Sequence, residues 1–340
     1  MKREKMGKGD KNFWICLRLF LFLDKMNDMN LQTVVKLEKP SFQVDYKTKM
    51  MLIGSCFVEN IGKKLAYYQF QTEINPCGVV YNPISVKETL NLLLENRPLD
   101  ISDLLENNGK WVSLKHHGSF SAVSCTEALE RMNERLAIAA KQLRKTDVLV
   151  ITWGTSWVYR YRSTGEIVSN CHRFSAVDFD RFRLSVDEIV DCYTDLLNQL
   201  WHLRPDLKVI MTISPVRHWK DGAHGNQLSK AVLLLAMERL CERFKEIYYF
   251  PAYELVMDEL RDYRFYGEDL LHLSVSGVEY VWEKFKECFL QLDTQEWMRK
   301  IERCNKILAH RPFDQDSEMA QELQIRTHEE LKRLLQQIHE

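Results

Sequence analysis

The segment KMMLIGS (residues 49–55) runs directly into CFVENIGKKLAYYQF (residues 56–70), and this junction indicates the fold class. The first part is a short apolar run that ends in a glycine and a serine. The second part places apolar residues at helical spacing. The junction therefore predicts a buried strand, a tight turn and a helix, with Ser55 at the turn.

The same alternation of strand and helix recurs along the chain. VLVIT (148–152) is an uninterrupted apolar and β-branched run, which is typical of a strand buried on both faces of a parallel sheet. Alternating strands and helices of ten or more residues favour a three-layer α/β/α sandwich with a parallel, flavodoxin-like sheet. Further strands are expected at 79–81, 207–214 and 246–250, and helices at 85–95 (with a Ser85–Glu88 capping box), 126–143, 185–203, 226–244 and 275–290.

The composition changes after Leu292, where the chain becomes charged and helical. We expect a main domain over residues 29–292 and a charged helical tail over 293–340. Two amphipathic helices, separated by a turn at Arg311-Pro312, would form this tail and pack on the domain or on a partner protein. Residues 1–28 precede the first strand-like pattern and form an N-terminal extension.

The extension contains an apolar run, FWICLRLFLFL (13–23), that has two explanations. Translation could begin at Met26 or Met29, which would make the run an artefact of start assignment. Alternatively, a genuine segment 1–25 would export or anchor the protein. Arg18 interrupts the run, and no small-residue cleavage site follows it, so the first explanation is preferred.

The charged and sulfur-containing residues restrict the class of protein. The 47 basic and 48 acidic side chains leave a formal charge of -1, so neither nucleic acid nor an acidic membrane surface is an expected partner. The nine cysteines are scattered and form no C-x-x-C pair, which argues against a disulfide framework or a zinc ribbon. This pattern suits a reducing compartment, and we expect the cytoplasm.

Two short elements supply candidate catalytic residues. Ser55 would present its hydroxyl at the sheet edge, where the first amides of the next helix favour negative charge, although Gly-Ser is also a common helix N-cap. In the segment Asp269-Leu-Leu-His272, the carboxylate can fold back on the imidazole and orient it as a base for a serine. Such a spacing is common by chance. Ser55 and the Asp269–His272 segment therefore indicate a catalytic site only when they are considered together.

Longer stretches resemble the GSCFA family, an SGNH-like group of hydrolases. IGSCFVENIG (53–62) matches the family signature, with Val58 in place of its alanine. The resemblance covers residues 33–290. It extends to NPCGVVYNPIS (75–85), WVSLKHHGSFS (111–121), WGTSWVY (153–159), SNCHRF (169–174), SPVRHWKDGAHGNQLSKA (214–231), FPAYELVMDELRDYRFY (250–266) and DLLHLS (269–274).

The resemblance implies acyl-ester chemistry that needs no cofactor. Ser55 would attack the carbonyl, His272 would take and return the proton, and Asp269 would orient His272. The oxyanion would be held by the amide of Ser55 and by Gly78.

The third oxyanion donor departs from the SGNH pattern. Gly154-Thr155 stands where that pattern has Gly-x-Asn-Asp. Thr155, the Gly154 amide or Asn170 could replace the missing asparagine.

Other interpretations of the same loops stay open. Cys56 could be the nucleophile of a thiol enzyme. A metal could bind among the histidines, although their spacing is not that of a zinc motif. His117, Arg217 and His218 are candidate substrate contacts, and the tryptophans at 111, 153, 157 and 219 could stack on sugar rings or fill the core.

Two functions of different classes follow. The first is an esterase or O-acyltransferase that acts on acyl esters, acetyl being the simplest, of a carbohydrate or small metabolite. The second is a non-catalytic module that recognises an acylated ligand, or a protein partner through the C-terminal helices. The missing Gly-x-Asn-Asp block motivates the second function.

Overall fold

The computed structural model describes residues 32–310 and 318–339. Of these, residues 32–36 belong to one compact unit, and residues 37–310 and 318–339 belong to a second. The expected extension 1–28 and the turn at Arg311-Pro312 lie outside the described residues.

The centre of the second unit is a parallel sheet of five strands, in the order β10-β9-β5-β1-β2. In chain order this arrangement is 2-1-3-4-5, the flavodoxin-like order, so the predicted fold class is confirmed. The order reverses between β1 and β5, and ligands bind at such a reversal, beyond the carboxyl ends of the strands. The strands are β1 (Met50–Gly54), β2 (Thr72–Ile74), β5 (Val148–Trp153), β9 (Lys208–Ile213) and β10 (Ile247–Phe250).

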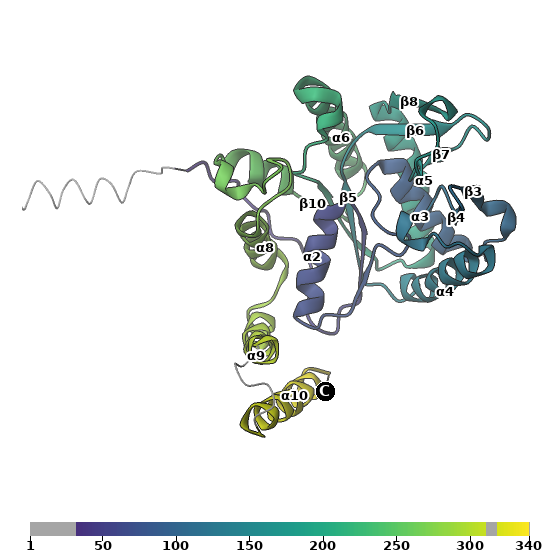
Figure 1. The fold of residues 1–340 in the computed structure, drawn as a ribbon. Coiled ribbons are helices and arrows are strands. Elements are labelled where there is room, and N and C mark those ends of the chain that lie inside the picture. The colour runs from purple at the N-terminus through teal and green to yellow at the C-terminus, as the bar shows by residue number, and fades with distance from the viewer. Residues whose placement is uncertain (1–31, 311–317, 340) are drawn as a thin grey trace, which may run out of the picture. The chain divides into compact units, whose positions relative to one another are not determined.

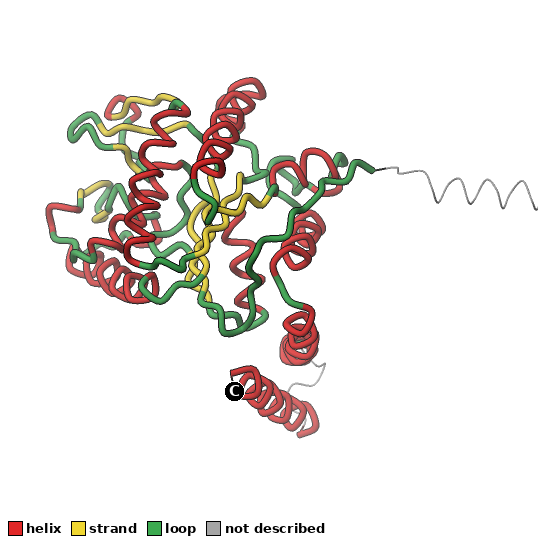
Figure 2. The backbone as a smooth tube through the Cα atoms, turned by 180° about the vertical axis from the view of Figure 1, so that it is seen from behind, coloured by secondary structure: helices red, strands yellow, loops and turns green. Residues whose placement is uncertain are grey.

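Helices cover both faces of this sheet, and Figures 1 and 2 show the layers from opposite sides. Helices α2 (Cys56–Tyr67) and α8 (Val275–Phe289) contact each other on one face. Helices α3 to α6 cover the other face, where Met51, Ile151 and Met211 join a continuous buried core with them. These helices are α3 (Pro83–Glu95), α4 (Cys125–Leu143), α5 (Val186–Leu203) and α6 (Gly222–Arg243).

The strand expected at 79–81 is wrong, and the second strand of the sheet is β2. Val80 N–H donates to Gly54 O at 3.1 Å, whereas Tyr81 O accepts from the amides of Gly154 and Thr155 at 2.7 and 3.0 Å. The segment therefore links the ends of β1 and β5 as a loop. Val80 is 1% exposed, so burial explains its apolar side chain without strand pairing, whereas Tyr81 is 39% exposed.

Two helices begin earlier than expected. Helix α3 starts at Pro83 because the side chain of Asn82, not Ser85, caps it by accepting from Ser85 N at 2.8 Å. Proline suits a first helical position, since its missing N–H would have no partner there. Helix α6 starts at Gly222. The helices expected at 185–203 and 275–290 are confirmed as α5 and α8, whose N-caps are Ser185 and Ser274.

Two small antiparallel sheets were not predicted, because their strands are too short for a clear alternating pattern. One is the hairpin of β3 (Leu105–Asn107) and β4 (Lys110–Val112). The other has the order β7-β6-β8 and is inserted after β5. Its strands are β6 (Trp157–Tyr161), β7 (Ile167–Val168) and β8 (Phe179–Arg183).

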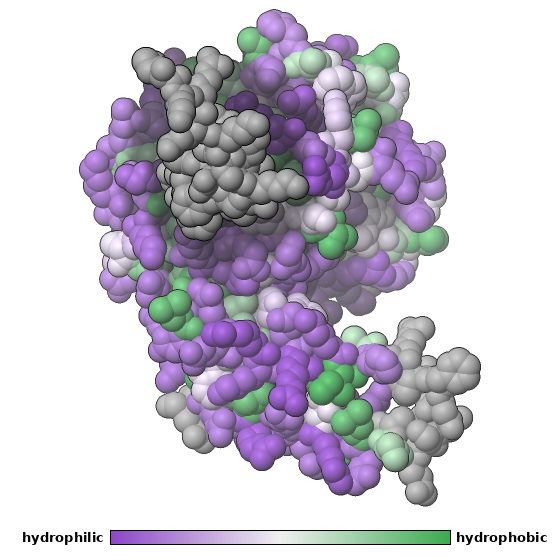
Figure 3. All heavy atoms as spheres, turned by 90° about the vertical axis from the view of Figure 1, so that its left-hand side faces the viewer, coloured by the Kyte–Doolittle hydropathy of each residue, from purple (hydrophilic) through white to green (hydrophobic). Residues whose placement is uncertain are grey.

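The C-terminal region forms two helices that contact each other, α9 (Leu292–Ala309) and α10 (Glu318–His339). Hydrophobic patches interrupt a hydrophilic surface in the lower part of Figure 3, and Leu292 and Met319 are 80% and 81% exposed. A protein partner for these helices stays a prediction. Among the described residues, no helix combines the length and the hydropathy needed to cross a membrane.

Candidate active site

Ser55 occupies the corner where β1 ends and α2 begins. It is the N-cap of α2, and its Oγ accepts a hydrogen bond from Phe57 N at 3.3 Å. The residue is 1% exposed. The hydroxyl therefore lies at the positive end of a helix dipole, beneath the surface of the sheet edge.

Gly54 allows this corner to form. Its φ is +144°, and a Cβ at this position would lie 2.2 Å from the carbonyl oxygen of Thr152 in β5. Its N–H donates to Asn75 Oδ1 at 2.8 Å, so the residue after β2 also holds the corner. Only glycine can bring the backbone of β1 this close to β5 at the position before Ser55.

Asp269 and His272 form a hydrogen-bonded pair on the loop between β10 and α8. His272 Nδ1 donates to Asp269 Oδ2 at 2.6 Å, and Asp269 Oδ1 accepts the amides of Leu271 and His272, each at 2.9 Å. The hydrogen bond from His272, followed by those from the amides, lowers the pKa of Asp269 to about 2. The carboxylate is therefore ionised at neutral pH and can stabilise an imidazolium.

The pair lies at the surface, unlike Ser55. The side chains of His272 and Asp269 are 57% and 48% exposed. Leu270, between them, has a φ of +60°, and Gly267 N–H closes the loop on His272 O at 2.8 Å. No hydrogen bond joins Ser55 to His272 within the described part of the chain.

His218 connects the two regions. A Cβ at Gly154 would lie 3.1 Å from His218 Nε2 and 3.6 Å from the Ser55 Cβ, so these residues meet at one point. Burial, and then the charges of Lys230 and of nearby residues that include His272, lower the pKa of His218 to about 4. Its imidazole is therefore neutral at physiological pH and lies beside the serine.

The candidate oxyanion donors have partners within the protein. Gly78 N–H donates to Asn75 O at 2.8 Å, and the amides of Gly154 and Thr155 both donate to Tyr81 O. Thr155 Oγ1 lies 3.0 Å from Ser229 Oγ. The oxyanion role of these residues stays a prediction, since an incoming ester would have to compete for their amides.

Asn170 and His117 lie in loops near this edge. Asn170 Oδ1 accepts from His172 N at 2.9 Å, an arrangement that shapes its own loop. A Cβ at Gly78 would lie 2.2 Å from the Cβ of His117, so the His117 side chain packs on the glycine. Its Nδ1 lies 3.0 Å from Ser119 Oγ.

The alternative chemistries gain no support from the geometry. Burial raises the pKa of the Cys56 thiol, which disfavours the nucleophilic thiolate. Residues 32–310 and 318–339 contain no group of three or more side chains placed to hold a metal ion. Trp153 belongs to the core, whereas Trp219 is 51% exposed.

Lys230 is a site residue that the sequence prediction missed. It is 1% exposed, and its Nζ donates to Gly154 O at 2.7 Å and to Ser214 O at 2.6 Å, so it joins the ends of β5 and β9. Burial lowers the pKa of Lys230 to about 7. The available signal was its spacing: it lies on the same helical face as the apolar residues Leu233 and Met237.

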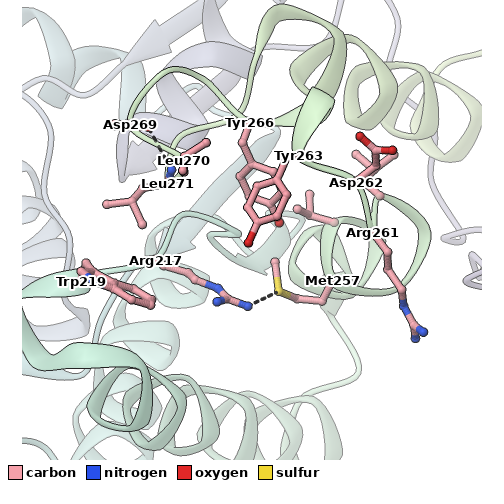
Figure 4. A pocket seen from close by; sticks show the side chains of 12 residues that line it. Arg217, Trp219, Met257, Arg261, Asp262, Tyr263, Tyr266, Asp269, Leu270 and Leu271 are labelled. Atoms are coloured by element: carbon pink, nitrogen blue, oxygen red, sulfur yellow. Dashed lines mark hydrogen bonds between the residues drawn. The ribbon is translucent and has the colours of Figure 1, made fainter.

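A pocket of about 560 Å³ opens beside the Asp269–His272 loop. Figure 4 shows Arg217 and Trp219 on one wall, Tyr263 and Tyr266 on another, and Asp269 at the rim. Two lining residues, Arg217 and Leu271, are followed in the chain by His218 and His272. His218 and His272 are therefore chain neighbours of the pocket lining but are not themselves lining residues.

Comparison with known proteins identifies the family. The model of the GSCFA family matches residues 49–285. No curated protein matches the chain.

The solved structures that match this chain are distant from it in sequence. A family 3 carbohydrate esterase of Clostridium thermocellum is 11% identical, with a TM-score of 0.34, covering 74% of this chain and 97% of that one. A family two carbohydrate esterase from the same organism, in complex with cellohexaose, is 15% identical with a TM-score of 0.35, covering 78% and 67%. The periplasmic domain of a Salmonella lipopolysaccharide acetyltransferase is 10% identical with a TM-score of 0.35, covering 72% and 84%. Similarity at these scores carries no argument about activity.

Proposed function

We propose, from the premise that the chain belongs to the GSCFA family, that it is a serine esterase or O-acyltransferase acting on acyl esters. One observation supports the proposal: the segment between β10 and α8 holds a hydrogen-bonded Asp269–His272 pair, and Ser55 directly follows the end of β1. A serine needs a base and the base needs an orienting carboxylate, and these three residues are the complete set.

In the first half of the reaction, Ser55 Oγ attacks the carbonyl carbon of the ester. The hydroxyl proton passes to Nε2 of His272, whose Nδ1–H remains bonded to Asp269. The tetrahedral intermediate then collapses, and the alcohol departs with the proton from His272. This step leaves an acyl group on Ser55.

In the second half, His272 removes a proton from water or from an acceptor hydroxyl, which attacks the acyl-enzyme. The bond between the acyl group and Ser55 Oγ then breaks, and Ser55 takes the proton back from His272. Water gives hydrolysis, and an acceptor alcohol gives transfer. The choice depends on which nucleophile the adjoining pocket admits. An acetyl ester of a carbohydrate or small metabolite is the simplest substrate of either reaction, and neither reaction requires a cofactor.

A second candidate function is a binding module that recognises an acylated ligand without turnover. The burial of Ser55 and the occupied amides of Gly78, Gly154 and Thr155 favour it. In that case the pocket would hold the ligand while Ser55 acts only as a helix cap.

Labelling with a fluorophosphonate distinguishes the two functions, because only an activated serine reacts with it. Wild-type protein is expected to gain one adduct by intact mass, and both Ser55→Ala and His272→Ala are expected to lose it. Ser119→Ala is a matched control, since Ser119 also contacts a histidine but belongs to a different loop. Labelling that survives in folded Ser55→Ala, or that is lost in Ser119→Ala, would contradict the assignment of the nucleophile.

A further inference from the structure

The pocket beside the Asp269–His272 loop contains a positive charge that has no counter-ion. In the described part of the chain, the one hydrogen bond of the Arg217 side chain joins Nη2 to the sulfur of Met257 at 3.6 Å, and Arg217 Nε is buried without a hydrogen-bond partner. Within the described residues, no carboxylate forms an ion pair with Arg217. Partly burying a guanidinium without a partner costs free energy that a bound anion would recover.

The other charged residues that line the pocket are paired. Arg261 binds Asp258 at 3.0 Å, and Asp262 binds Arg264 at 2.8 Å. Asp269 binds His272. Arg217 is therefore the lining charge still available to a ligand.

The surroundings of Arg217 favour an anion over a neutral group. Lys230 and Arg217 act on each other electrostatically, and Lys230 adds a second positive charge while it is protonated, below its pKa of about 7. The charge of Arg217 also acts on the hydroxyl of Tyr266, a lining residue that offers a hydrogen-bond donor (Figure 4). Arginine binds carboxylates and phosphates through paired N–H donors, and the apolar walls would hold the rest of the ligand.

We infer that Arg217 recognises an anionic group, a carboxylate or a phosphate, on the substrate of this site. The inference rests on the proposed function for the identity of the ligand as an ester. Because Arg217 and Leu271 directly precede the two histidines, an anion held by Arg217 would place a neighbouring ester bond near His218 and His272. Arg217 would then select substrates without taking part in proton transfer.

Calorimetric titration of the full chain carrying Ser55→Ala tests the inference without turnover. Three acetyl esters serve as probes: 4-acetoxyphenylacetate, 4-acetoxybenzyl phosphate and the neutral 4-acetoxyphenylacetamide. We expect the carboxylate or the phosphate to bind with a Kd at least about ten-fold lower than the amide. The better of the two anionic probes identifies the recognised group.

Substitution of Arg217 in the same background provides the decisive comparison. In Arg217→Met, the Kd values of the anionic and neutral probes are expected to agree within about two-fold. Arg261→Met removes a paired arginine of the same pocket and should retain the preference for the anionic probe. Arg217→Gln replaces Arg217→Met if the latter does not fold. Equal Kd values for all three probes, a preference that survives loss of Arg217, or no binding of any probe would overturn the inference.

The outcomes separate this inference from the proposed function. Anion preference together with failure of fluorophosphonate labelling would retain the anion site and reject the esterase. Labelling of Ser55 without anion preference would retain the esterase and reject the anion site.

Discussion

The corner around Ser55 and the loop around His272 supply two parts of one proposed catalytic site, but they are built differently. Ser55 is 1% exposed and depends on the contact of Gly54 with β5. His272 is more than half exposed, and hydrogen bonds within residues 267–272 hold it. The nucleophile thus depends on the core, whereas the base depends on its own loop.

The difference extends to backbone strain. Leu270 has a left-handed φ of +60°, although it is not a glycine. Its side chain is 55% exposed. This conformation costs a leucine about 1 kcal/mol. The amides that donate to Asp269 Oδ1 offset the cost, so the loop is strained where it forms the Asp269–His272 pair.

Gly54→Ala should have the largest effect, because it disrupts the corner and the core together. The added Cβ would overlap a backbone oxygen of β5, which cannot move as a flexible side chain can. We expect a loss of at least about 4 kcal/mol in the free energy of unfolding, measured by urea denaturation. Gly118→Ala, where a Cβ meets nothing within 4 Å, should stay within about 0.5 kcal/mol of wild type. Equal stability of the two variants would contradict the dependence of the corner on glycine.

Asp269→Asn should have the next largest effect, which we expect on kcat/KM and not on stability. Asparagine keeps an Oδ1 for the amides of Leu271 and His272 but cannot accept the Nδ1 proton at the other position. We expect kcat/KM to fall by roughly 10³-fold, about 4 kcal/mol, with little change in stability. Asp258→Asn, which breaks an exposed ion pair nearby, is the control and should be close to wild type. A rate close to wild type in Asp269→Asn would remove Asp269 from the mechanism.

Lys230→Met tests whether the buried Lys230 stabilises the ends of β5 and β9 beside Ser55. The change leaves the buried carbonyls of Gly154 and Ser214 without their donor, at a cost of about 1–3 kcal/mol when Lys230 is neutral. Because the pKa of Lys230 in the folded state, about 7, lies below its ordinary value of 10.5, the unfolded state binds more protons between these pH values. Wild type should therefore gain stability relative to Lys230→Met as the pH rises through this range.

Urea denaturation at about pH 7 and about pH 9 measures that gain. The exposed Lys63→Met on α2 should show no such pH dependence relative to wild type. Parallel pH curves for wild type and Lys230→Met would show that Lys230 does not titrate in this range.

His218→Gln should have the smallest effect on the shape of the pH–rate profile. His218 lies beside Ser55, but burial lowers its pKa to about 4, so it stays neutral over the usual assay range. Between about pH 5 and about pH 8, the profile of kcat/KM should keep its midpoint, whatever the absolute rate. A displaced midpoint would make His218, and not only His272, a proton acceptor in the reaction.

The sequence predicted the parts of this protein that depend on neighbouring residues. The strand–turn–helix unit at Ser55 and the helices α5 and α8 follow from apolar periodicity. The Asp269–His272 pair is a contact of the same range. The parallel sheet follows because strands that alternate with helices have few other ways to bury both faces.

The tertiary structure decided what depends on distant segments. The apolar run at 79–81 gave no sign that it would link β1 to β5 as a loop. The contacts of Lys230 with Gly154 and Ser214, and the meeting of His218 with Ser55, join residues from separate elements. Arg217 lacks a counter-ion because of which side chains the fold places around it. Periodicity and spacing report which face of an element is buried, but packing of the whole chain determines what that face meets.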